Sequence, residues 1–124
     1  MNEGELKART KAFAVRIVRL VRALPRSMDA RLIGSQLMRA GTSVGANYRA
    51  ACRARSKAEF VSKLGTVEEE ADECEFWLEL IVETGLMKES LVRPLLDEAG
   101  ELVAIMTASR KSSSCAVRNQ KSKI

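Results

Sequence analysis

The chain has 124 residues, which suffices for one domain with its own core. Hydrophobic residues make up 46% of it and aromatic residues only 4%, a composition that favours packed helices over a sheet. The net charge is +5, histidine is absent, and the three cysteines form no C-x-x-C motif. These features argue against a zinc site, a disulfide framework and a histidine-dependent active site.

The first helix is predicted over residues 5–24, ended by Pro25, because the residue before a proline is disfavoured in helical geometry. Its apolar positions are Leu6, Phe13, Ile17, Leu20 and Leu24. Asp29 is predicted to cap the second helix. The inward positions of that helix are Ile33, Leu37, Ala40, Val44, Asn47 and Ala51. Gly34, Gly41 and Gly45 lie within this helix, and its apolar pattern continues through them. We therefore favour close helix packing at the glycines over a ligand-binding loop.

The third helix has the clearest start, because Ser56 and Glu59 form the pattern of a capping box. Its apolar positions keep a strict spacing of four and three: Phe60, Leu64, Val67, Ala71, Cys74, Leu78 and Ile81. Gly85 is predicted to end it in the left-handed conformation. The fourth helix has inward positions at Leu91, Leu95, Leu102 and Ile105 or Met106, and Pro94 predicts an irregular start.

Short connections near residues 25–28, 54–57 and 85–89 make consecutive helices antiparallel neighbours. The predicted fold is therefore all-α, an up-down-up-down four-helix bundle of residues 1–111. Residues 112–124 are polar and basic, and we expect them to form a disordered tail. The polar N-terminus, MNEGELKART, has no apolar signal segment, and no apolar run reaches the roughly 18 residues that a membrane helix needs, so we expect a cytoplasmic protein.

Charge is distributed unevenly along the chain. Basic residues dominate residues 4–56, whereas residues 57–87 contain nine acidic and two basic residues. Arginine forms bidentate contacts with phosphate, so the arginines of the first two helices are candidate nucleic-acid ligands. They are Arg9, Arg16, Arg19, Arg22, Arg26, Arg31, Arg39, Arg49 and Arg53. A face that merely solvates the bundle, or one that meets the acidic third helix of another subunit, explains the same pattern equally well.

Asn47 lies in an apolar pattern and needs a hydrogen-bond partner if it is buried. We expect a structural polar network that fixes the register of two helices, formed by Arg39, Ser43, Asn47, Glu69 and Glu73. An acidic stripe runs along the third helix at Glu68, Asp72, Glu75, Glu79 and Glu83. We favour a solvated face or a contact with the basic helices over a metal site, because bundle di-iron sites use Glu-x-x-His motifs and this chain has no histidine. We expect no metal, no cofactor and no enzymatic activity.

Two stretches carry a resemblance to a known family: QLMRAGTSVGANYRAA (36–51) and SKAEFVSKLGTVEEEADECEFWLEL (56–80). They resemble the four-helix bundle protein family, also called the 23S rRNA intervening-sequence protein family, over residues 5–107. The pattern is carried by Arg39, Ser43 and Asn47, then by Phe60, Leu64 and Trp77-Leu78. Many relatives have a proline and a glutamate where this chain has Gly45 and Ala50.

The resemblance implies an antiparallel bundle that assembles into a homopentameric ring. It also implies two kinds of partner, RNA or DNA on the one hand and, in a related branch that serves diversity-generating retroelements, a reverse transcriptase on the other. We therefore expect a non-enzymatic homo-oligomer that binds structured nucleic acid through its basic surface. The alternative is a protein-interaction scaffold, such as an accessory subunit of a retroelement reverse transcriptase.

Overall fold

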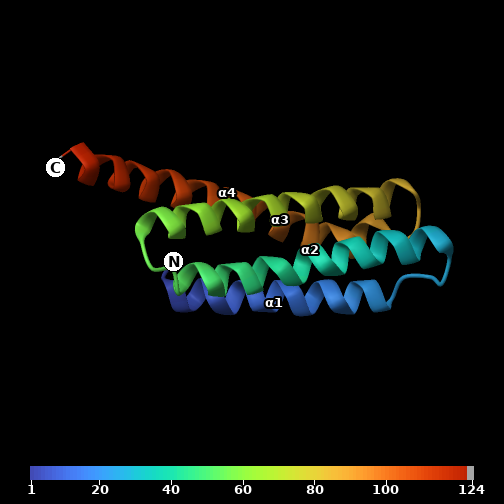
Figure 1. Cartoon of the computed structure of the whole chain (residues 1–124). Coiled ribbons are helices and arrows are strands. Elements are labelled where there is room, and N and C mark those ends of the chain that lie inside the picture. Colours follow the sequence, from blue (N-terminus) through green and yellow to red (C-terminus); the bar gives the residue numbers. More distant parts are fainter. Residues whose placement is uncertain (123–124) are drawn as a thin grey trace.

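The computed structural model describes the backbone of residues 1–122 and the side chains of residues 1–114. It contains four helices and no strand over these residues: α1 (Glu3–Arg22), α2 (Met28–Cys52), α3 (Lys57–Glu83) and α4 (Glu89–Ser122). Each helix packs along the next, and α4 passes beside α1, which closes the bundle (Figure 1). The predicted all-α architecture with four helices is confirmed. No helix in the described chain combines the length and apolar character needed to cross a membrane.

The core is built mostly from the predicted apolar positions, to which the structure adds Ala30, Leu96 and Ala99. Phe13 and Ile17 of α1 and Leu64 and Leu78 of α3 are fully buried. Two predictions were wrong by one position. Tyr48 is buried where Asn47 was expected, and Leu91 is 63% exposed because Val92 takes the inward position. An ideal helix drifts by about 20° per heptad against a strict 3.5-residue repeat, which moves such borderline residues off the core.

The helix ends show how local sequence sets the boundaries. Ser27, and not Asp29, caps α2, because its hydroxyl accepts the Ala30 N–H at 3.4 Å. Ser56 caps α3 and accepts the Glu59 N–H at 3.1 Å, as predicted. The Glu59 carboxylate accepts in return from the Arg55 N–H at 3.0 Å. The predicted capping box is thus present, with its return bond shifted by one residue.

Gly85 ends α3 as predicted, with φ of 75°. The Gly85 N–H donates to the Val82 carbonyl and the Leu86 N–H to the Ile81 carbonyl, each at 3.1 Å. These two bonds form a Schellman motif and satisfy two carbonyls at the end of the helix. The chain then turns tightly enough for α4 to begin at Glu89.

The start of α4 differs from the expected irregular turn. The helix runs through Pro94 without interruption, since Pro94 is exposed and water can reach the carbonyl that its missing N–H leaves unpaired. The far end differs from the expected disordered tail, because α4 continues to Ser122 and extends beyond the other helices (Figure 1). Residues 112–122 contain neither Gly nor Pro to stop the helix. Residues 123–124 lie outside the described residues.

The glycines of α2 mark its closest approach to α1. A Cβ atom added at Gly41 would lie 2.7 Å from Cγ2 of Ile17, and one at Gly34 would lie 3.1 Å from Cγ1 of Val21. At Gly45 the nearest atom would be the Thr10 carbonyl oxygen at 3.3 Å. The interpretation of these glycines as a packing surface fits these distances, since no side chain fits between the helices at Gly41.

Replacing Gly41 by valine should therefore destabilise the bundle. The added methyl groups would overlap the side chain of Ile17, and such overpacking costs about 1–3 kcal/mol. The matched control is Gly65→Ala on α3, where the new Cβ would make an ordinary contact of 3.6 Å with Arg110 and should stabilise the helix by about 0.5–1 kcal/mol. Urea unfolding at one protein concentration measures both changes. A Gly41→Val protein as stable as the parent would contradict the close approach.

Candidate nucleic-acid interface

The nine candidate arginines separate into two groups according to their partners. Arg9 and Arg39 form ion pairs with carboxylates of other helices. The other seven form no ion pair within the described residues, and all seven are exposed: Arg16, Arg19, Arg22, Arg26, Arg31, Arg49 and Arg53. The structure thus places eight of the nine predicted ligands at the surface, and engages Arg9 and the exposed Arg39 in contacts between helices.

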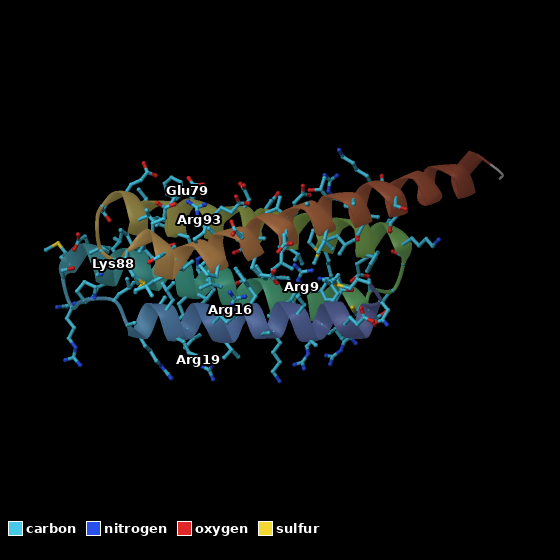
Figure 2. The ribbon with its side chains drawn as sticks, turned by 180° about the vertical axis from the view of Figure 1, so that it is seen from behind. Arg9, Arg16, Arg19, Glu79, Lys88 and Arg93 are labelled. Carbon is cyan, nitrogen blue, oxygen red and sulfur yellow. The ribbon has the colours of Figure 1, made fainter. Side chains whose placement is uncertain are left out.

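Arg9 joins α1 to α4. Its Nε and one terminal nitrogen donate to the two carboxylate oxygens of Glu98, each at 2.7 Å, and Glu101 adds a contact at 3.2 Å. The Arg9 side chain is 25% exposed and that of Glu98 only 13%. The hydrogen bond from Arg9 lowers the pKa of Glu98, and this gain exceeds the opposing effect of burial. Figure 2 shows Arg9 between the two helices, where it acts as a structural clamp.

Arg39 joins α2 to α3, but the predicted polar network does not form as one unit. Arg39 pairs with Glu73, as expected, and with Glu70 at 3.2 Å in place of Glu69, which is exposed. Asn47 donates to the Ser43 carbonyl of its own helix at 2.9 Å. Asn47 is half-buried and does not need an acceptor from α3, because its position lies at the edge of the core. Arg39, Glu70 and Glu73 thus link α2 to α3 at the surface, and Asn47 is not part of this cluster.

The outer surface of α1 and α2 carries a basic groove that the sequence did not reveal. Its volume is about 190 Å³. Three cationic side chains, Lys7, Lys11 and Arg49, stand around a floor of small residues that includes Ala14, Gly45 and Ala46. The floor is small because the two helices touch there. Lys7 pairs with the exposed Glu3 at 3.3 Å, a surface contact of little strength that a phosphate can displace.

The remaining arginines extend this basic surface along α1 and α2. Arg19 points away from the bundle (Figure 2), and Arg22, Arg26 and Arg31 surround a second hollow where α1 turns into α2. Arg16 differs from them, because it lies closer to α4 and its charge contributes to the lowered pKa of Glu98. Lys7 and Lys11 were missed as ligands although their spacing of four residues on one helix is a usable signal.

The opposite side of the bundle is acidic. A groove between α3 and α4 is lined by Glu75, Glu79, Asp97 and Glu101, with Arg93 among them. Burial raises the pKa of Glu75, and the nearby carboxylates of Asp72 and Glu79 raise it further. Within the described part of the chain, no group of three or more acidic, cysteine or histidine side chains has a geometry that would hold a metal ion.

Two cysteines lie within the described side chains, and burial keeps both thiols protonated. Cys74 is fully buried in the core, and burial raises its pKa to about 12. Burial likewise raises the pKa of Cys52, which lies at the edge of the core near Tyr48. A thiol is a poor nucleophile in its protonated form, so neither cysteine has the character of a reactive nucleophile.

Comparison with known proteins agrees with this architecture. A sequence model of the 23S rRNA-intervening sequence protein family matches residues 3–108. The structure is similar to the crystal structure of a protein of unknown function from the S23 ribosomal protein family of Bacteroides thetaiotaomicron VPI-5482. The two share 33% identity with a TM-score of 0.83, over 90% of this chain and 99% of the other. No curated protein matches the chain.

The clamp between Arg9 and Glu98 can be tested through the pH dependence of stability. Replacing Arg9 by methionine leaves a mostly buried carboxylate without its partner and should cost about 1–2 kcal/mol at pH 7. Because the folded pKa of Glu98 is lowered, the stabilisation is present above the usual carboxyl pKa of about 4.3 and is lost as the pH falls through the folded value.

The measurement is urea unfolding of both proteins between pH 3 and pH 7, where the two stabilities should converge toward the acidic end. The control is Arg93→Met, which removes an exposed ion pair with Glu89 within α4 and should leave stability unchanged. A difference between parent and Arg9→Met that stays constant across this pH range would show that the ion pair does not carry the effect.

Proposed function

This chain belongs to the 23S rRNA-intervening sequence protein family, and we propose that it is a non-enzymatic, homo-oligomeric bundle that binds structured RNA or DNA through the outer surface of α1 and α2. The observation that supports this most directly is the groove around Lys7, Lys11 and Arg49. Its three cations line the groove together with small residues, which would let a phosphate approach the helices closely. The family resemblance supports assembly into a homopentameric ring.

The chemistry of this surface favours recognition of the phosphate backbone. Within the residues whose side chains are described, Lys7, Lys11 and Arg49 form no ion pair with another helix, so a phosphate does not have to break a contact between helices to bind them. The groove lining contains no aromatic residue on which a base can stack. Binding should therefore depend on charge and on the shape of the nucleic acid, with little preference for sequence.

A protein-interaction scaffold is the second candidate. It is supported by large apolar side chains on the surface, since Leu32 is 60% and Leu91 63% exposed. Such residues suit a protein partner, for example a reverse transcriptase that the chain would serve as an accessory subunit. A pull-down from the native host that survives nuclease treatment would favour this function over nucleic-acid binding.

The proposed binding can be tested with a fluorescent RNA stem-loop and a DNA duplex of equal length. Changing Lys7, Lys11 and Arg49 to glutamate should abolish binding or weaken it at least tenfold, and affinity of the parent should fall steeply between roughly 50 and 300 mM salt. Each lost phosphate contact reduces the slope of log K against log salt by about 0.7–0.9, so this variant should lose about 2–3 units of slope.

The matched control changes Lys57, Lys63 and Lys88 to glutamate, which alters net charge equally but lies outside the α1–α2 groove. It should retain most of the affinity. Circular dichroism confirms that each variant is folded. Binding by the parent that does not depend on salt, or equal loss in both variants, would rule out the groove as the site.

A further inference from the structure

The outer face of α3 exposes one large aromatic side chain. Phe76 is 53% exposed, whereas Cys74 and Leu78 on either side of it in sequence are fully buried, so Phe76 points away from the core. The ring of Trp77 packs against it at 5.0 Å between centroids and an interplanar angle of 76°. The two rings therefore make a favourable edge-to-face contact.

Carboxylates lie along the helix on both sides of Phe76. Asp72 and Glu79 lie four residues before it and three after it, and Glu69 and Glu83 lie seven residues away on either side. All four are exposed, and none forms an ion pair within the described residues. The complementary surface for Phe76 and these carboxylates is a basic one with an apolar hollow that can accept the phenyl ring.

The outer face of α1 provides such a surface. A hollow of about 450 Å³ there is lined by Ala14, Val15 and Val18, with Lys11, Arg19 and Arg22 at its edges. Val15 is 42% exposed, so the floor of the hollow is apolar and open. This hollow lies further along α1 than the phosphate groove, and only Lys11 and Ala14 line both.

We infer that Phe76 of one copy of this chain inserts into the hollow around Val15 on a second copy, with the carboxylates of α3 facing Arg19 and Arg22. This inference rests on the proposed self-association and assigns its two faces. Apolar contact supplies the attraction, while the charges fix the orientation and exclude pairing of like faces.

The position of the two faces sets the kind of assembly. Helices α1 and α3 make no close contact with each other, because they occupy diagonal corners of the bundle (Figure 1). The two faces therefore look in opposite directions, and each copy can bind one neighbour with each face. Such a head-to-tail contact generates a ring when the rotation closes, whereas a two-fold dimer would use one face twice.

The first experiment measures mass in solution by light scattering. The parent should be larger than the monomer mass of 13.7 kDa, and Phe76→Glu should reduce it to that value. The matched control is Leu91→Glu, the same kind of change at a still more exposed apolar site on α4, which should leave the assembly intact. Because Phe76 lies outside the core, both variants should keep the helicity of the parent.

A second experiment tests the pairing of faces. The double variant Arg19→Glu/Arg22→Glu should also be monomeric, since it reverses the charge of the α1 face. Mixed with Phe76→Glu, it should form a 1:1 dimer and nothing larger, because only one intact face of each kind remains. Native mass spectrometry measures this product and distinguishes it from either variant alone.

The outcomes separate the two proposals. A parent that is monomeric at every concentration overturns the self-association and this inference together. A parent that assembles while Phe76→Glu assembles equally, or a mixture that gives no dimer, overturns only the assignment of faces. Nucleic-acid binding is measured independently through Lys7→Glu/Arg49→Glu, because Lys7 and Arg49 line the groove but not the hollow around Val15.

Discussion

The contact between α1 and α2 at Gly41 is the constraint on which the surface chemistry depends. With no side chain at Gly41, the helices approach until Ile17 lies against the α2 backbone. Gly45 repeats this closeness one turn later against the carbonyl of Thr10. Two helices that lie this close present their outer side chains as one surface. The groove that gathers cations from both helices is thus a consequence of backbone packing.

Ion pairs between helices explain why the charged residues do not all serve one surface. Arg9 and Arg39 pair with carboxylates across the α1–α4 and α2–α3 boundaries, and Arg110 likewise holds Glu68 at 2.7 Å between α3 and α4. Each of these arginines pairs with a carboxylate of another helix. The hydrogen bonds lower the pKa values of the half-buried Glu68 and Glu98. What remains on the outside is the excess of each sign, basic on α1 and α2 and acidic on α3.

The sequence was sufficient for the architecture because several independent signals agreed. The spacing of Leu64, Cys74 and Leu78, the cap at Ser56 and the stop at Gly85 each indicated the same third helix. Where only one signal was present, the prediction failed by a residue. Asn47 and Leu91 lie at the edge of their apolar patterns. The next residue along the helix, Tyr48 or Val92, is buried in the core in their place.

The candidate site was less predictable, because it depends on which side of a helix faces which neighbour. Spacing along α1 cannot tell that Arg9 lies toward α4 and Lys7 toward α2, since both are simply outside the apolar stripe. The order of packing around the bundle resolves this. In the proposed ring every copy would present the same groove around Lys7 and Arg49, so that weak contacts to phosphate repeat along one nucleic acid. Multivalent binding of this kind raises affinity without base-specific contacts, which is what a groove without aromatic residues requires.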